Sequence, residues 1–471
     1  MRIMAIFALR IESTDNSMAY FKRNIDKRLL EWKESRNRKP LLVRGARQIG
    51  KSSSIRNFAR SFRYFIEINF EMHRNVASLF EQEYDVDVLC ERLSVLYSTP
   101  VIPGETLLFF DEVQACESAL KSLWFFKENL PELHVIAAGS LLEFSLKNMP
   151  AYGVGRVSSI FMYPLSFNEF LSAIGKDEWV EAIEKASARK PLFEALHKEL
   201  VGAYRTFLLV GGMPASVRAW VETRNYQECI DELSDIQQTY YDDFTKYSKK
   251  ISPEVLKNTL QSVIAQTGQK FMYSKVSGAY PAEEVKRSLD MLVSAGIVKP
   301  VRYTAANGMP LGAEVNHKFT KYLYLDSGLL LRVLDLDFGG SKPLTEMIVA
   351  GSEADLVNKG KLAELSVGWE LVKASNSRHG YELYYWENLD KGTTSEVDYI
   401  VAREMQVLPV EVKSGTSGKM KSLRLFMNRK HIEKAIRTSL ENFGVLTYDD
   451  GDFSRIISIV PIYAIGLIVD K

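Results

Sequence analysis

Residues 45–53 place two glycines, a lysine and hydroxyl groups at the spacing that a phosphate-binding loop requires. The stretch is Gly45-x-x-x-x-Gly50-Lys51-Ser52. The glycines let the backbone turn and bring its N–H groups close to phosphate oxygens. Lys51 would reach the β- and γ-phosphates, and Ser52 would offer its hydroxyl to Mg²⁺. We therefore expect ATP to contact the whole stretch, namely Gly45, Ala46, Arg47, Gln48, Ile49, Gly50, Lys51, Ser52 and Ser53.

The flanks of this loop have the order that phosphate binding needs. Leu41–Arg44 is a short apolar run typical of a buried parallel strand, and a helical pattern continues to Arg60. A strand, a glycine loop and a helix in succession put the partial positive charge of the helix N-terminus beside the phosphates. The alternative interpretation is a glycine-rich turn without chemical function.

A second candidate element is the segment ETLLFFDEVQ, which covers Glu105–Gln114. Its apolar run Leu107–Phe110 predicts a buried strand that delivers Asp111 and Glu112 at its C-terminal end, where open α/β sheets bind ligands. Asp111 would hold Mg²⁺, and Glu112 would polarise the attacking water as a general base. A strand that ends in a solvated acidic turn is the alternative.

Two further polar residues follow in this part of the chain. Ser140 ends the apolar run HVIAAGS and would sense the γ-phosphate, or else serve as the N-cap of the next helix. Arg156 stands between glycines and a strand-like run. It would stabilise developing charge on the γ-phosphate, as an arginine finger does, or else be an ordinary surface arginine.

The C-terminal third contains carboxylates where a buried sheet would normally hold Val or Ile. Between Ser395 and Gly415, alternation along two strands places Asp398 on one strand and Glu411 with Lys413 on the other. A short connection would bring Asp398 near Glu411, so that both could hold Mg²⁺ while Lys413 orients water and stabilises phosphate charge. Glu364, on a preceding amphipathic helix, would complete the site. The alternative is an exposed hairpin face with a cross-strand salt bridge.

These residues need elements to position them. In the first third, five buried strands are expected, separated by helical stretches, which predicts an α/β sandwich around the phosphate-binding loop. The strands are Leu41–Arg44, Tyr64–Phe70, Leu107–Phe110, His134–Ala138 and Val157–Tyr163. Helices are expected over 167–246, broken at Gly211, Gly212 and Pro214, and would form a lid over the nucleotide.

The middle of the chain predicts helices followed by a hairpin, an order that is similar to a winged helix. Glu254–Gly268 and the stretch 280–295 are helical, a strand covers Ile297–Tyr303, and Asn307-Gly308 signals a turn. Six cations could contact DNA phosphates, although Glu283, Glu284 and Asp290 dilute the patch, so a small packing domain with solvated lysines stays an alternative. The six are Lys270, Lys275, Lys286, Arg287, Lys299 and Arg302.

The composition is that of an ordinary globular protein without a strong charge bias. The 471 residues include 60 basic and 59 acidic ones, so any nucleic-acid surface must be a local patch. Three scattered cysteines suit a reducing cytoplasm, and no apolar run reaches the roughly 18 residues that a membrane span needs. Residues 1–19 are expected to be a loose extension rather than a signal peptide, with Met18 as a candidate start.

Six motifs in fixed order give the chain a family resemblance. They are GARQIGKS, LLFFDEVQ, AAGSLLEFSL, YPLSFNEFL, GGMPASV and KYLYLDSGLL. Together they resemble predicted AAA-superfamily P-loop ATPases of bacteria and archaea that carry an uncharacterised C-terminal region. The resemblance runs from about Tyr20 to the C-terminus and implies ATP and Mg²⁺ binding at Gly50, Lys51, Ser52, Asp111 and Glu112.

The C-terminal segment EVDYIV…LPVEVKSG resembles the restriction-endonuclease-like PD-(D/E)xK fold. This implies Asp398, Glu411 and Lys413 as nuclease residues, although Val397 stands where the motif's proline would be. The expected organisation is an N-terminal extension (1–19), a P-loop core (20–165), a helical lid (166–250), a winged-helix-like domain (251–338) and a nuclease-like α/β domain (339–471).

The functional hypothesis is an ATP-hydrolysing protein whose nucleotide state controls a C-terminal nuclease-like or DNA-interacting module. The alternative is a nucleotide-dependent switch whose inactive nuclease-like domain docks protein or DNA. The expected cofactors are ATP and Mg²⁺. DNA is a candidate partner, a membrane is not, and the oligomeric state is left open.

Overall fold

The computed structural model describes residues 20–82, 85–139, 155–247, 251–336, 359–375, 380–390, 395–416, 420–450 and 453–468. Described residues before Pro164, together with Gly380, form one compact unit, and the other described residues form a second. Within these ranges, no helix combines the length and hydropathy that a membrane crossing needs. Ser140 and Met18 lie outside the described residues.

The first unit contains a parallel five-stranded sheet. Its strand order is β2 (Tyr64–Asn69), β3 (Thr106–Asp111), β4 (His134–Ala138), β1 (Leu41–Arg44) and β5 (Ser158–Phe161). Every neighbouring pair is parallel. The prediction of an α/β fold with a parallel sheet is confirmed. Uninterrupted apolar runs bury both faces of such strands.

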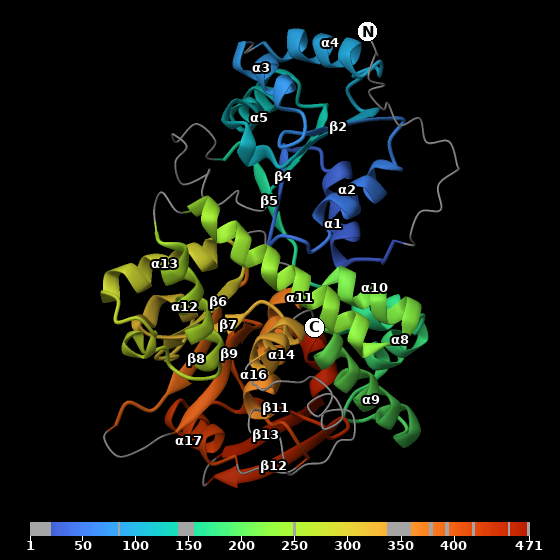
Figure 1. Ribbon diagram of the computed structural model, residues 1–471. Helices are drawn as coiled ribbons and strands as arrows, with labels where there is room; N and C mark the ends of the chain where they lie inside the picture. Colours follow the sequence, from blue (N-terminus) through green and yellow to red (C-terminus); the bar gives the residue numbers. More distant parts are fainter. Residues whose placement is uncertain are drawn as a thin grey trace. The chain divides into compact units, whose positions relative to one another are not determined.

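Helices cover both faces of this sheet (Figure 1). Alternate strand residues such as Ile68, Phe110 and Ala137 pack with the helices of one face in a continuous apolar core. On the other face, Trp32 contacts the rings of Phe58 and His134. The helices are α1 (Asn24–Glu34), α2 (Lys51–Ala59), α3 (Arg74–Gln82), α4 (Val86–Leu96) and α5 (Glu117–Asn129).

The second unit is built on a mixed eight-stranded sheet. Its order is β12 (Gly444–Asp450), β13 (Phe453–Pro461), β11 (Lys434–Ser439), β10 (Gln406–Val412), β9 (Glu396–Arg403), β8 (Leu383–Glu387), β6 (Val298–Thr304) and β7 (Val315–Tyr324). The pairs β10–β11, β11–β13 and β6–β8 are parallel, and the others are antiparallel.

The hairpin of β6 and β7 is part of this larger sheet, because β6 pairs with β8. The sheet therefore contains strands from both sides of the expected boundary at residues 338 and 339. Two helices precede the hairpin, as a winged helix requires, and the winged-helix and nuclease-like interpretations stay predictions.

The helices of the second unit break where the sequence predicted. Helix α9 ends at Val210 and α10 begins at Pro214. A Cβ atom on Gly212 would lie 2.3 Å from the Leu165 carbonyl oxygen, so only glycine fits there. The helices are α7 (Phe167–Ala173), α8 (Asp177–Lys185), α9 (Glu194–Val210), α10 (Pro214–Thr223), α11 (Tyr226–Asp243), α12 (Pro253–Ala265), α13 (Ala282–Ser294), α14 (Ser327–Leu336), α16 (Lys359–Ala374) and α17 (Lys421–Arg429).

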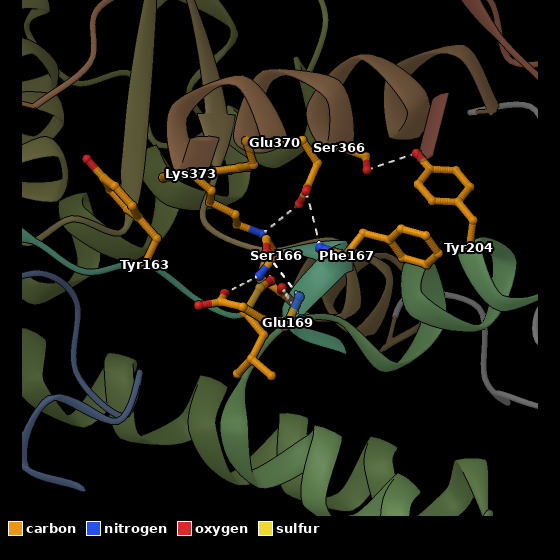
Figure 2. A network of polar contacts seen from close by, with 12 residues as sticks. Tyr163, Ser166, Phe167, Glu169, Tyr204, Ser366, Glu370 and Lys373 are labelled. Atoms are coloured by element: carbon orange, nitrogen blue, oxygen red, sulfur yellow. Dashed lines mark hydrogen bonds and ion pairs between the residues drawn. The ribbon is translucent and has the colours of Figure 1, made fainter. Parts of the chain in front are cut away.

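Helix α16 is tied to the start of α7 by buried polar contacts (Figure 2). The Lys373 ammonium donates to the Leu165 carbonyl at 2.8 Å, and Glu370 accepts from the Phe167 N–H at 3.2 Å. Ser366 accepts from the Tyr204 hydroxyl at 2.9 Å. These contacts fix the helix that carries Glu364 against the segment that directly follows the first unit.

Candidate functional site

The backbone of the phosphate-binding loop needs glycine at two points. Gly45 has a φ of 144° and Gly50 a φ of 93°, values that side chains rarely adopt. A Cβ atom on Gly45 would lie 2.2 Å from the Met162 carbonyl oxygen. The Ser54 N–H bonds back to the Gly50 carbonyl, so the N–H groups at the beginning of α2 point toward the loop.

Lys51 is buried and bonded to its own loop. Its ammonium donates to the Gly45 carbonyl at 3.0 Å and to the Ala46 carbonyl at 2.7 Å. Burial lowers the pKa of Lys51 to about 8, although Glu112 and Asp111 oppose the shift. A buried ammonium that is bonded only to neutral carbonyl oxygens is suited to gain from an anionic phosphate.

The magnesium ligands proposed from the sequence lie together. The Ser52 hydroxyl is 3.0 and 3.1 Å from the two carboxylate oxygens of Asp111. Asn69 donates to the same carboxylate at 3.3 Å, a contact that no motif indicated. Burial, with the charge of Glu112, raises the pKa of Asp111. A hydroxyl beside a carboxylate is a donor set that suits Mg²⁺.

Glu112 directly follows these ligands and adopts a left-handed backbone conformation with a φ of 47°. Its carboxylate accepts a 2.6 Å hydrogen bond from the side chain of Gln114. A non-glycine residue in this conformation is uncommon and is associated with functional sites. The arrangement orients one carboxylate beside the metal ligands without pairing it to a cation among these contacts.

Two residues before the loop support it and were not anticipated. The Arg23 guanidinium donates to the Ile49 carbonyl at 3.0 Å, and the Tyr20 hydroxyl donates to Ser54 at 3.0 Å. Neither residue belongs to a recognisable pattern, so only the tertiary structure reveals them. They hold the end of the loop and the first turn of α2.

Arg156 is engaged with helix α5. Its guanidinium lies 2.7 Å from the Glu128 carboxylate and 5.3 Å from the centroid of the Trp124 ring. Both interactions are with surface-facing residues. The arginine-finger role of Arg156 stays a prediction, and it would require this pair to open.

The second candidate site lies on strands β9 and β10 of the second unit. Their register pairs Val410 with Tyr399, so Glu411 stands opposite Asp398 at the next position. Side chains that are directly opposite in an antiparallel pair share a face, with Cβ atoms about 5 Å apart. One Asp398 oxygen accepts from the Val412 N–H at 2.7 Å. The two acids therefore lie on one face of the sheet, and the metal site of the hairpin interpretation stays a prediction.

Glu364 and Glu396 join Asp398 in a carboxylate cluster. One oxygen from each of the three lies within 4.8 Å of the others. Two ionised carboxylates at that separation would repel by about 3.5 kcal/mol at an effective dielectric constant of 20. Burial, together with Glu364 and Glu411, raises the pKa of Asp398 well above its usual value. Such a cluster needs cations.

Lys321 of β7 supplies one cation from within the fold. Its side chain is fully buried and its ammonium contacts Glu364 at 2.8 Å and also Glu396. Burial alone would lower the pKa of Lys321, but the surrounding carboxylates outweigh it and raise that pKa. Lys321 stays charged and holds two of the acids in place.

Lys413 supplies the second cation, at the partly exposed side of the cluster. Its ammonium is 2.6 Å from one oxygen of Glu411. The other oxygen of Glu411 is buried without a hydrogen-bond partner among the described residues. Burial raises the pKa of Glu411, and Lys413 only partly offsets this. An unpaired buried carboxylate oxygen on the residue opposite Asp398 is suited to a metal ion.

Lys321 and Glu396 were not predicted from the sequence as part of this site. The sequence does contain an indication of Lys321. In a strand, Lys321 shares one face with the apolar residues Phe319 and Leu323. A lysine at a core-facing position needs a buried partner. Glu396 shares a face with Asp398 and could have been included on that ground.

Two glycines let the backbone lie close to side chains at the cluster. A Cβ atom on Gly268, which has a φ of 74°, would lie 2.8 Å from Glu364 Oε2. The Tyr399 hydroxyl donates to the backbone carbonyl of Glu364 at 2.6 Å. Gly368 leaves room for the Tyr399 hydroxyl, which would be 2.4 Å from a Cβ there. Helix α16 is thereby held against β9.

Three of the six cations proposed for DNA phosphates are in ion pairs. Lys270 pairs with Glu387, Arg302 with Glu382 and Arg287 with Glu283. These pairs reduce the positive potential of the patch. This agrees with the expectation from the sequence that neighbouring acids dilute the patch. A DNA surface there stays a prediction.

Family models match three parts of the chain. Residues 37–171 match an AAA domain. Residues 201–338 and 359–465 match two domains of unknown function, DUF8612 and DUF4143. The first match agrees with the sheet, the loop and the acids described above, so residues 37–171 are similar to an AAA domain. No curated protein matches this chain.

Several solved structures share weak overall similarity with the chain. A Walker-type ATPase of Pyrococcus abyssi is 17% identical, with 67% of this chain and 96% of that chain covered and a TM-score of 0.44. The ORC1 protein of Aeropyrum pernix, solved in complex with DNA, is 12% identical over 70% and 93%, with a TM-score of 0.27. The Hsp104–ADP complex of S. cerevisiae is 12% identical over 58% and 38%, with a TM-score of 0.26.

Proposed function

We propose that the chain binds ATP with Mg²⁺ at residues 45–53 and hydrolyses it to ADP and phosphate. The observation that carries this proposal is the contact of Ser52 with Asp111 beside the buried Lys51. Mg²⁺ held there would neutralise phosphate charge. Glu112 would take the proton of the attacking water, because its carboxylate is oriented next to these ligands.

Nucleotide binding and turnover in three variants test this proposal. Lys51→Ala should abolish ATP binding, and Glu112→Gln should keep binding but stop turnover. Lys121→Ala, which removes an exposed helix ion pair with Glu117, should behave as wild type. ATP hydrolysis by Lys51→Ala at the wild-type rate would refute the assignment.

We propose further that the carboxylate cluster is a nuclease-like centre for DNA. The placement of Asp398 and Glu411 on one face of β9 and β10, with Lys413 paired to Glu411, supports this proposal. Purified protein with Mg²⁺ or Mn²⁺ would be offered linear, nicked and branched DNA. Cleavage should disappear in Asp398→Ala and persist in Asp449→Ala, which changes an exposed acid of β12. Cleavage that survives Asp398→Ala would sink the proposed centre.

The second candidate is a nucleotide-dependent binding switch in which the cluster is inactive and the domain only docks protein or DNA. The ion pairs that occupy the cluster, Lys321 with Glu364 and Lys413 with Glu411, favour a structural role of this kind. DNA binding without cleavage, unchanged in Glu411→Ala, would select this function over the nuclease.

We propose that nucleotide state reaches the cluster along the chain itself. The Met162 N–H bonds to the Arg44 carbonyl at 2.8 Å, directly before the loop glycine Gly45. Three residues later, the Leu165 carbonyl accepts from Lys373 of α16, the helix that carries Glu364. Lys373→Met should keep ATP turnover but remove its effect on DNA cleavage or binding. An unchanged effect of ATP in this variant would exclude the route.

A further inference from the structure

The carboxylate cluster contains an internal cation, the ammonium group of Lys321. Lys321 is on β7, and its side chain has no solvent exposure. The ammonium contacts two acids that come from different elements, Glu364 of α16 and Glu396 of β9. It also lies 5.0 Å from the centroid of the Tyr385 ring. A strand in the sheet and a closed shell of partners fix its position.

Each acid of the cluster has one oxygen committed to a contact within the protein. The Lys321 ammonium donates to Glu364 Oε1 and to Glu396 Oε1. The Val412 N–H donates to Asp398 Oδ2, and the Lys413 ammonium donates to Glu411 Oε1. These contacts leave the second oxygen of every carboxylate for an ion. The Glu411 Oε2 atom is buried and without a hydrogen-bond partner among the described residues, which is an independent indication of a ligand.

The charges limit how many ions fit. Counted with Glu411 and the two lysines, the cluster has four carboxylates and two ammonium groups, which leave two negative charges when all are ionised. One divalent cation neutralises that charge, whereas a second would leave a buried positive excess. Without Lys321, the acids would carry an excess of three negative charges. Two divalent cations would then exceed it by one charge rather than by two, and the space between Glu364 and Glu396 would be open to a cation.

We infer that Lys321 takes the place of a second metal ion, so that the cluster binds one divalent cation. This inference rests on the proposed metal-dependent function of the cluster and specifies its stoichiometry. The single ion would lie toward Asp398 and Glu411, on the side that Lys413 borders, and Lys321 would keep its contacts with Glu364 and Glu396.

The test is the number of Mn²⁺ ions bound by the full chain without nucleotide, measured by calorimetry and by electron paramagnetic resonance. Asp398→Asn provides the background from other acids, including Asp111. Wild type should bind one ion more than Asp398→Asn. Lys321→Met should bind two ions more, with the spectral broadening of a coupled Mn²⁺ pair, whereas Lys321→Arg should still bind one.

The control is Lys318→Met, which removes an exposed lysine from the same strand and should bind one ion. Two ions in wild type overturn the inference while leaving the nuclease-like proposal intact. No ion lost in Asp398→Asn overturns both. If Lys321→Met does not fold, the counts for wild type and Lys321→Arg decide, because two ions in either contradict the inference.

Discussion

The phosphate-binding loop and the carboxylate cluster both contain a buried lysine, but they use it in opposite ways. Lys51 bonds only to neutral carbonyls of its own loop, so an arriving phosphate can replace them. Lys321 bonds to two carboxylates from distant elements, so its partners are already charged. The first lysine is prepared for an anion. The second lysine neutralises part of the negative charge that an added cation would otherwise neutralise.

The difference extends to how the two sites are built. The loop is a contiguous stretch whose geometry depends on two glycines and a following helix. The cluster joins residues from β7, α16, β9 and β10, which the chain brings together only when the second unit is folded. A contiguous site fails through local strain, and an assembled site fails through the loss of a supporting element.

The largest effect is expected for Gly45→Ala. The added Cβ would lie 2.2 Å from the Met162 carbonyl oxygen, and the backbone there has a φ of 144°. Relief requires the loop to shift, so ATP affinity should fall by more than about 100-fold, or roughly 3 kcal/mol. Fluorescent-nucleotide titration measures this. Gly202→Ala, where a Cβ has open space, is the control, and wild-type affinity in Gly45→Ala would contradict the geometry.

Asp398→Asn and Asp111→Asn should separate the two metal sites. All the metal ligands proposed for the cluster are protein side chains, so they are present without nucleotide. At Ser52 and Asp111, the remaining metal ligands would come from the phosphates of bound ATP. In nucleotide-free protein, Asp398→Asn should weaken Mn²⁺ binding by roughly 50-fold, about 2.3 kcal/mol, and Asp111→Asn should leave the strongest site unchanged. Calorimetry with Mn²⁺ distinguishes them. Equal losses in both variants would show that the sites are not independent.

Gly268→Ala should affect the cluster through its supporting shell. A Cβ there would press on Glu364 Oε2 at 2.8 Å in a backbone with a φ of 74°. Displacing this ligand should lower Mn²⁺ affinity by about 20-fold, or roughly 1.8 kcal/mol, with ATP affinity unchanged. Gly360→Ala, which has open space in the same helix as Glu364, is the matched control. Unchanged Mn²⁺ affinity in Gly268→Ala would argue against Glu364 as a ligand.

The smallest effect concerns the pH dependence of the first unit. Burial, together with the nearby Arg38, lowers the pKa of His134 to about 4 from an ordinary 6.5. Because the unfolded chain binds the proton more readily, this stability is present above pH 6.5 and is lost as the pH falls toward 4. Between pH 7 and pH 5.5 the expected loss is roughly 1–2 kcal/mol.

Thermal unfolding of wild type and His134→Leu between pH 4 and 7.5 measures this loss. The variant should lack that part of the pH dependence. Identical profiles would show that His134 does not titrate differently in the folded protein. Metal binding by the cluster should be unaffected at constant pH, since His134 lies in the first unit.

Sequence patterns predicted the first unit closely. Strands β1 and β4 have the predicted bounds, because a fully buried parallel strand is a continuous apolar run. Ser52 and Asp111 were each predicted as Mg²⁺ ligands, and the structure places their side chains in contact. Arg23 was not, because an arginine before a helix carries no pattern that names its carbonyl partner.

In the second unit, patterns predicted the strands but not their common sheet. The parallel pair β6–β8 links segments about eighty residues apart, and no local signal specifies such a pair. Asp398, Glu411, Lys413 and Glu364 were identified from alternation and order. Lys321 was missed because its partners lie on other elements, and burial of a lysine is decided by packing.

The sequence by itself determined the parts whose chemistry is local: the glycine loop with Lys51 and Ser52, the acids at the end of β3, and the alternation that puts Asp398 and Glu411 on one face. Their geometry follows from neighbouring residues and from the period of a strand. Only the tertiary structure decided that Lys321 enters the carboxylate cluster and that α16 connects Glu364 with Leu165. Those contacts depend on long-range pairing, which fixes charges beside one another irrespective of their distance along the chain.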